Sequence, residues 1–193
     1  MFALMRQLLI VNADIDKTET TAALINAYKD GAHASDAVIK ELTIADLKFN
    51  PNKQFTLSNN EPEPDLVQAI NAIKWASHLV IFCPVYKDSI NSKIKGFFDR
   101  IFMPDQVFVT GANGLVHNFG GRTARIVSIL DEAAWQDWQI NNRPTYLAIK
   151  KTVLEKRNIK PVHTSTIGHL YALDNEYSKK WLQKLYSFGL KLI

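Results

Sequence analysis

Residues 78–102, HLVIFCPVYKDSINSKIKGFFDRIF, carry the strongest fold signal in this chain. Leu79 to Cys83 is an unbroken apolar run, which is typical of a strand buried on both faces of a parallel sheet. We predict that Pro84 ends this strand and that Ser89 caps the helix that follows. Apolar residues then recur at helical spacing, at Ile90, Ile94, Phe97, Phe98 and Ile101. Ligands of open α/β sheets bind beyond the carboxyl ends of the strands, so the turn between strand and helix is expected at the rim of a site.

The composition indicates an ordinary globular protein. The chain has 193 residues, of which 47% are hydrophobic and 22% charged. We expect a single domain, residues 1–193, that buries roughly 70% of the surface of its unfolded chain. No apolar run approaches the about 20 residues that a membrane span requires, so no span is predicted. The single cysteine, Cys83, excludes an internal disulfide, suits a reducing cytoplasm and is expected to be a small core residue.

Strands and helices are predicted to alternate along the whole chain. The predicted strands are 6–13, 37–42, 79–83, 122–130 and 162–167. The predicted helices are 20–32, ended by Gly31, and 65–76, 90–102, 145–157 and 178–190, with loops at 103–121 and 131–144. This alternation favours a doubly wound, five-stranded parallel sheet of order 2-1-3-4-5 with helices on both faces. In that order the loops after the first, third and fourth strands converge on one crevice.

Several runs of residues resemble one known family. Residues 94–102, IKGFFDRIF, are similar to the Leu-Lys-Gly-Phe-Phe-Asp-Arg-Val-Phe helix of flavin-dependent NAD(P)H:quinone reductases of the flavodoxin-like superfamily, which include the modulator of drug activity B type. The loop before that helix matches the family at Pro84, Ser89 and, loosely, Tyr86. Further matches lie at residues 75–77, 131–135, 158–162, 167–168 and 181–185.

The resemblance implies a flavodoxin-like three-layer sandwich and a homodimeric cytoplasmic enzyme. It implies FMN or FAD as cofactor, NAD(P)H as co-substrate and a quinone-like acceptor reduced by two-electron ping-pong hydride transfer. Under this resemblance, the apolar face of residues 90–102 and the aromatic loop 103–119 would form the dimer interface. A different class of protein stays open as an alternative: a flavodoxin-like regulatory or partner-binding module that has lost flavin binding.

The predicted loop after the first strand, NADIDKTETT at residues 12–21, supplies three hydroxyls and one lysine. Such groups at a helix N-terminus favour an anion site, and the resemblance implies that Thr18, Thr20 and Thr21 hold the flavin phosphate. The acidic residues Asp14, Asp16 and Glu19 oppose this function, because they outnumber Lys17. The alternative is a self-capped helix in which Asp16 is the N-cap and Glu19 completes a capping box.

The other two loops are predicted to contact the flavin ring and the substrates. The resemblance places Pro84, Val85, Tyr86, Lys87 and Ser89 along the ring, with Tyr86 stacking on it and also contacting substrate. Lys87 either lies near the flavin or forms a solvated pair with Asp88.

The loop after the fourth strand would contribute Leu130 and Asp131 to the cofactor site. Trp135 and Trp138 would then wall the substrate pocket, or they only pack the loop onto the sheet.

Other classes of site are not expected. No catalytic pair can be assigned, and the spacing of His117, His163 and His169 does not predict a metal site. The basic residues Lys150, Lys151, Lys156, Arg157 and Lys160 are expected to form a solvated helix face rather than a nucleic-acid site.

Overall fold

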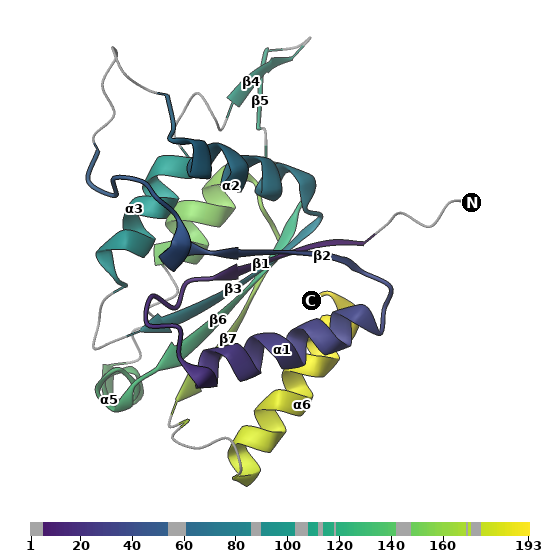
Figure 1. Ribbon diagram of the computed structural model, residues 1–193, viewed down its shortest axis with the longest axis vertical. Helices are drawn as coiled ribbons and strands as arrows, with labels where there is room; N and C mark the ends of the chain where they lie inside the picture. The colour runs from purple at the N-terminus through teal and green to yellow at the C-terminus, as the bar shows by residue number, and fades with distance from the viewer. Residues whose placement is uncertain are drawn as a thin grey trace.

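Five parallel strands form the sheet at the centre of the protein (Figure 1). They are β1 (Gln7–Asn12), β2 (Val38–Thr43), β3 (His78–Val85), β6 (Thr123–Leu130) and β7 (Val162–Gly168). Their order, β2-β1-β3-β6-β7, confirms the predicted 2-1-3-4-5 arrangement. The computed structural model describes residues 6–53, 61–85, 90–102, 108–111, 114–117, 119–141, 148–168, 170 and 175–193.

Helices cover both faces of the sheet, which gives the predicted three layers (Figure 1). Helices α1 (Glu19–His33) and α6 (Glu176–Lys191) cover one face. The other face is covered by α2 (Pro64–Trp75), α3 (Ser92–Ile101) and the helical turns η2 (Ala148–Leu154) and η3 (Glu155–Arg157). A short turn, η1 (Ile44–Asp46), follows β2, and α5 (Glu132–Asn141) follows β6.

The alternation of side chains along β1 explains the two cores. Leu8 and Ile10 pack beneath α1 and α6, whereas Leu9 and Val11 pack beneath α2 and α3. Successive side chains of a strand point to opposite faces of the sheet, so a strand that is apolar on both faces needs helices on both.

Strand β3 runs two residues beyond its predicted end, through Pro84 to Val85. Proline lacks the N–H group that a ladder needs, which is why a stop is predicted there. The pairing of β1 with β3 ends at Phe82, whose carbonyl accepts from the N–H of Ala13 at 2.9 Å. Alternate residues of a strand face the same neighbour, so the missing N–H of Pro84 lies on the side that β1 has already left.

Two helix ends differ from the prediction. Helix α3 begins at Ser92, and its N-cap is Asn91, whose Oδ1 accepts from the N–H of Lys93 at 2.9 Å, so the prediction of Ser89 as N-cap was wrong. Gly31 does not end α1, which continues to His33. A Cβ on Gly31 would lie 2.0 Å from the main-chain oxygen of Tyr186, so glycine is needed there for contact with α6.

Regular structure also replaces both predicted loops. Residues 103–121 contain an antiparallel hairpin, β4 (Phe108–Gly111) and β5 (Gly114–His117), which projects at the top of Figure 1. Residues 131–144 contain α5. Neither segment has the apolar periodicity on which prediction depends, and α5 is instead held by capping and by packing of its tryptophans. The predicted helix at 145–157 is found over its described part, as η2 and η3.

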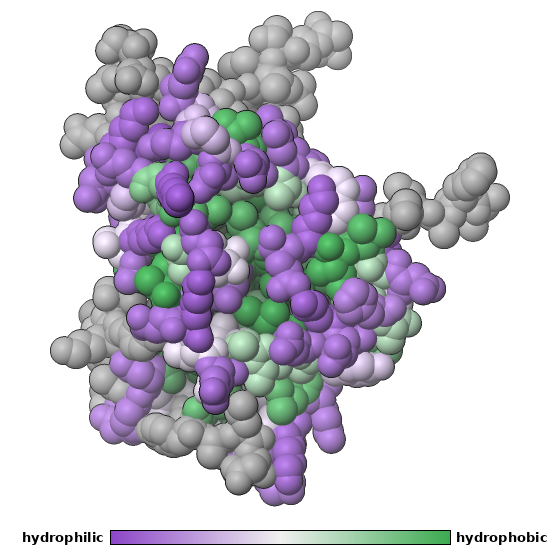
Figure 2. Space-filling view, in the orientation of Figure 1, coloured by the Kyte–Doolittle hydropathy of each residue, from purple (hydrophilic) through white to green (hydrophobic). Residues whose placement is uncertain are grey.

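The apolar face of α3 is not available as a dimer interface. Ile94, Phe97, Phe98 and Ile101 are buried in the core beneath the sheet, so the predicted interface role of that face was wrong. Among the residues whose burial is described, the exposed large apolar side chains are Val38, Val67, Tyr177, Tyr186, Leu190 and Ile193. On the face shown in Figure 2, hydrophobic residues form separate patches among hydrophilic ones.

The predicted basic face is partly used for packing. Arg157 donates to the main-chain oxygens of Thr152 and Phe102, and Lys150 lies 3.9 Å from Glu155. Lys151, Lys156 and Lys160 are exposed, as expected for a solvated surface. No helix within the described ranges is long and apolar enough to cross a membrane.

A buried polar network ties the amino ends of β3 and β6 to α1. His78 Nε2 lies 3.1 Å from the Tyr28 hydroxyl, and His78 Nδ1 lies 2.6 Å from Thr123 Oγ1. Burial, together with the positive charge of Arg125, lowers the pKa of His78 to about 3.

The imidazole of His78 is expected to stay neutral from about pH 8 to about pH 4. The unfolded chain binds this proton at the ordinary pKa of 6.5. The protein should therefore lose stability as pH falls from 6.5 toward 3, because the unfolded state binds more protons over that range. An NMR titration of the ring resonances checks the protonation state. A His78 midpoint near 6.5 in the folded protein would contradict the effect of burial.

Candidate functional site

The carboxyl ends of β1, β3 and β6 lie side by side, as the crevice prediction requires. The N–H of Ala13 donates to Phe82, and the N–H of Asp131 donates to Val85 at 3.3 Å. These bonds join the first residue after β1 to β3 and the first residue after β6 to the end of β3. The loops after the three strands therefore begin from one continuous edge.

Asp14 fills the loop after β1. Its side chain is fully buried, and its Oδ1 accepts from the N–H of Asp16 at 3.0 Å. Its Oδ2 accepts from the N–H of Thr18 at 2.9 Å and from the Thr18 hydroxyl at 2.6 Å. Burial alone would raise the pKa of Asp14, but hydrogen bonds from Thr18, Thr21 and Asp16 hold it below the ordinary value. Asp14 is therefore an ionised carboxylate at the entrance to α1.

Thr18, rather than Asp16, is the N-cap of α1, so the predicted capping box of Asp16 and Glu19 was wrong. The Thr18 hydroxyl accepts from the N–H of Thr21 at 3.3 Å and lies 3.0 Å from the Thr21 hydroxyl. Thr20 is half-buried one residue earlier. The three threonines do cluster at the helix N-terminus, but Thr18 and Thr21 are bonded within the loop.

Lys17 is the one lysine of residues 12–21, and its side chain is exposed. It pairs with Asp46 of η1, and its backbone has a positive φ of 54°. Left-handed backbone is uncommon for lysine and is sustained here by the turn into α1. The cation of this loop is thus already matched with a carboxylate.

The end of β3 supplies an apolar floor. Val85 is 1% exposed and packs with Leu130 and with Ala134 of α5. Pro84 lies one residue earlier, and its carbonyl faces the Cys83 thiol at 3.7 Å. Burial raises the pKa of Cys83 to about 12, so this cysteine is the predicted core residue. The predicted ring contacts Tyr86, Lys87 and Ser89 lie outside the described residues.

Asp131 begins α5. Its Oδ1 accepts from the N–H of Ala134 at 2.7 Å, and its carbonyl accepts from the N–H of Trp135. A carboxylate at this position stabilises the helix by bonding to a first-turn N–H and by meeting the positive end of the helix dipole. The hydrogen bonds of Asp131 therefore fix the start of α5 and the positions of Trp135 and Trp138 on it.

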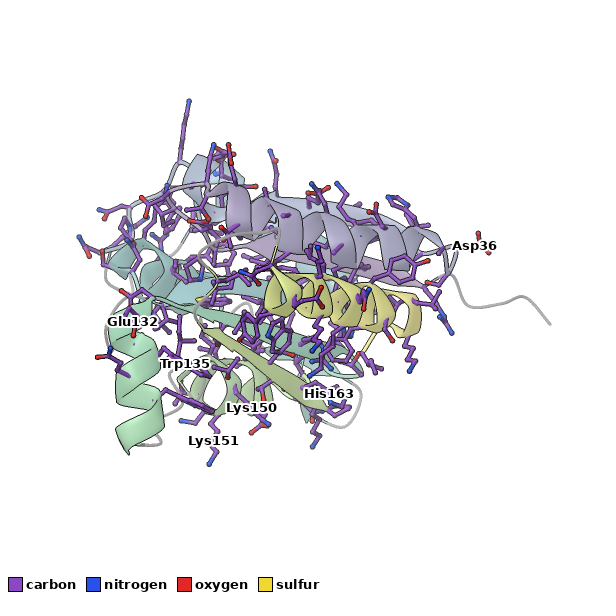
Figure 3. All side chains as sticks on the ribbon, turned by 90° about the horizontal axis from the view of Figure 1, so that it is seen from below. Asp36, Glu132, Trp135, Lys150, Lys151 and His163 are labelled. Carbon is purple, nitrogen blue, oxygen red and sulfur yellow. The ribbon has the colours of Figure 1, made fainter. Side chains whose placement is uncertain are left out.

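Trp135 and Trp138 stack on each other, with ring centroids 5.0 Å apart and an interplanar angle of 18°. In Figure 3, Trp135 extends from α5 toward the strands. A Cβ on Gly168, at the end of β7, would lie 2.2 Å from the Trp135 ring. The ring therefore packs directly on the end of the sheet, and glycine makes the approach possible.

Trp135 also walls a pocket of about 420 Å³, together with Gly168, Asn175, Glu176 and Tyr177. The predicted packing of Trp135 onto the sheet is thus found, whereas its role in substrate binding stays a prediction. Sequence reasoning missed Asn175, Glu176 and Tyr177, although Asn175 is the N-cap of α6. An asparagine just before an apolar helical pattern is a recognisable helix start, and it could have placed these residues at the same edge. No group of metal-binding side chains occurs among the described residues.

The model of the family described as flavodoxin-like fold matches residues 6–186. The NAD(P)H:quinone oxidoreductase of Methanothermobacter marburgensis aligns with a TM-score of 0.76 and 14% identity, over 98% of this chain and 100% of that one. The FMN-dependent NADH-azoreductase of Bacillus anthracis, solved with FMN, aligns with a TM-score of 0.68 and 16% identity, over 97% of this chain and 99% of that one.

The protein Smu.1420 of Streptococcus mutans gives a TM-score of 0.78 and 19% identity, over 96% of this chain and 99% of that one. A search of the curated proteins by sequence gives no significant match. At these identities the structural likeness concerns the fold. The family match spans nearly the whole chain, and this protein therefore belongs to the flavodoxin-like fold family.

Proposed function

We propose that this protein is a flavin-dependent oxidoreductase that uses NAD(P)H to reduce quinone-like acceptors. The observation that carries the proposal is the pocket of about 420 Å³ at the carboxyl edge, walled by Trp135 and Tyr177. Two aromatic walls suit a flat conjugated ligand, which they can hold by stacking. Two structural neighbours are named as an NAD(P)H:quinone oxidoreductase and as an FMN-dependent azoreductase, which supports the proposal.

We propose that the ring end of a flavin lies at the edge where the strand ends meet. Val85 and Leu130 are buried there against Ala134 of α5 and give that edge an apolar base. We propose that Tyr86, Lys87 and Ser89, which follow Val85 in the chain, complete the ring site. When bound, a flavin supplies two-electron hydride transfer, in ping-pong order, between NAD(P)H and a quinone-like acceptor.

The chain itself contributes shape and orientation. Trp135, which stacks on Trp138, packs on the end of β7, and this pair is proposed to shield the ring site from water. Asp131 holds that pair in place through the cap of α5. Glu176 brings a carboxylate to the pocket and is proposed to accept hydrogen bonds from the N–H or O–H groups of a substrate.

The proposal extends to the oligomeric state and the cellular location of the enzyme. On the resemblance in sequence, we propose a single domain that forms a cytoplasmic homodimer. Because the apolar face of α3 is buried in the core, any dimer contact must use another surface. FMN is the flavin found in the azoreductase neighbour, and nothing in the described residues favours the larger FAD.

Trp135→Ala is expected to raise KM for a soluble quinone by about tenfold, because the loss of an aromatic contact weakens binding by up to about 1.5 kcal/mol. The measurement is the rate of NAD(P)H oxidation with added flavin, as a function of quinone concentration. Tyr186→Ala removes an aromatic ring that is 42% exposed on α6 and serves as the control. An unchanged KM in Trp135→Ala would remove this pocket from the proposed site.

A second function is favoured by Asp14, which occupies the loop where a phosphate would bind. This is the regulatory or partner-binding module without a flavin. A folded protein that binds no flavin and does not oxidise NAD(P)H would support the second function and contradict the first.

A further inference from the structure

We infer that the loop after β1 excludes a phosphate group, so that the site takes a flavin without one, such as riboflavin, in preference to FMN. The inference rests on the proposed function and narrows it to a class of flavin. It comes from a disagreement between the fold family and this chain. A phosphate does not fit the loop in which Asp14 lies.

The hydrogen-bond donors of the loop after β1 are already occupied by Asp14 and Thr18. A phosphate at a helix N-terminus binds to backbone N–H groups and hydroxyls of the preceding loop. In this chain the N–H groups of Asp16 and Thr18 and the hydroxyl of Thr18 already donate to Asp14, at 2.6 to 3.0 Å. The N–H of Thr21 donates to Thr18. A phosphate would have to displace the Asp14 carboxylate to reach these donors.

The position of Asp14 is fixed by contacts on several sides. Its own N–H donates to Asn12 Oδ1 at 2.9 Å, and its side chain is fully buried. The residue before it, Ala13, is bonded to β3 through Phe82. Asp14 is therefore built into the junction of β1, β3 and α1.

The negative charge of the loop after β1 also opposes a phosphate. A phosphate monoester carries a charge of about −1.5 to −2 near neutral pH. It would meet the carboxylate of Asp14, with Asp16 and Glu19 exposed nearby in the chain. Lys17, which could offset this charge, pairs with Asp46. Like charges in a partly buried site repel strongly, because little water screens them. The loop thus repels the group that the fold family would bind there.

The flavin ring and the phosphate would contact different residues of the protein. The residues proposed for the flavin ring, Val85 and Leu130, lie at the ends of β3 and β6 and do not depend on the Asp14 cluster. A neutral side chain on the ring avoids the repulsion. Riboflavin has such a side chain. The carboxylate that opposes FMN is therefore compatible with riboflavin.

The test is a fluorescence titration of the wild-type protein and of Asp14→Ser with riboflavin and with FMN. Wild type is expected to bind FMN about tenfold or more weakly than riboflavin. Asp14→Ser frees the loop donors and supplies a hydroxyl, so it is expected to bind FMN about tenfold or more tightly than wild type, with riboflavin affinity changed less than about threefold.

Asp16→Ser is the matched control, because it removes the same charge two residues away without removing the buried carboxylate. It is expected to change FMN affinity by less than about threefold. Retained riboflavin binding shows that Asp14→Ser is folded, and the wild-type comparison does not depend on any variant.

The outcomes separate the two claims. Wild-type protein that binds FMN more tightly than riboflavin overturns the inference and leaves the proposed function in place. Wild-type protein that binds neither flavin overturns the proposed function and, with it, the preference for riboflavin. An equal gain of FMN affinity in Asp16→Ser would also overturn the inference, because net charge rather than Asp14 would then be responsible.

Discussion

Glu63→Gln is expected to lower the free energy of unfolding by about 3–5 kcal/mol, because it leaves a buried cation without its counter-charge. Arg100 of α3 is 2% exposed, and its two terminal nitrogens donate to the carboxylate of Glu63. Arg100 also donates to the carbonyl of Asn50 at 2.8 Å, while its Nε has no partner among the described residues. The Arg100 guanidinium on α3 thus binds two residues, Asn50 and Glu63, of the connection between η1 and α2. Denaturant unfolding measures the loss.

The same pair gives a pH dependence of known sign. Burial raises the pKa of Glu63, but hydrogen bonds from Arg100 outweigh it and bring the pKa down to about 2 from 4.5. This part of the stability is present above pH 4.5 and is lost as pH falls toward 2, because the unfolded state takes up the proton first. Glu63→Gln should remove that part of the acid dependence.

The control for Glu63→Gln is the exposed pair of Lys95 and Asp99 on the same helix. Asp99→Asn is expected to change the free energy of unfolding by less than about 0.5 kcal/mol, because surface ion pairs contribute little. Similar losses in Glu63→Gln and Asp99→Asn would contradict the argument from burial.

Gly189→Ala is expected to destabilise the protein by about 3 kcal/mol, at the upper end of the usual range for overpacking. A Cβ on Gly189 of α6 would lie 2.0 Å from the carbonyl oxygen of Tyr28 in α1. The atom in the way belongs to a helix backbone, so the two helices must move apart. The contact is reciprocal, because Gly31 of α1 approaches Tyr186 of α6 equally closely.

The sign of this effect is informative. In an exposed helix, Gly→Ala stabilises by up to about 1 kcal/mol, so a loss of stability points to the helix contact. Gln183→Ala, at an exposed site on α6, is the control and is expected to stay within about 0.5 kcal/mol of wild type. Thermal or denaturant unfolding checks both. A stabilised Gly189→Ala would show that the helices can separate at little cost.

Local pattern is enough to predict the architecture. The apolar runs that became β1 and β3 are hydrophobic on both faces, and such strands require helices on both sides of a parallel sheet. The amphipathic spacing of residues 90–102 likewise predicts which face of α3 is buried. The ends of the elements were less predictable, because they depend on neighbours. Pro84 is accommodated because β1 has already ended, and Gly31 is kept for α6 rather than for a helix end.

The candidate site shows the same division. Local pattern is enough to predict which loops meet at the carboxyl edge, since strand order and crossover handedness follow from the alternation of strands and helices. The residue types after β1 also reveal the conflict between three threonines and three acids. Tertiary contacts resolve that conflict, because burying Asp14 beside β3 turns its carboxylate toward the N–H groups at the start of α1. The hydrogen-bond partners of Asp14 are near in the chain, but its burial depends on β3, which is distant, and local periodicity carries no information about that contact.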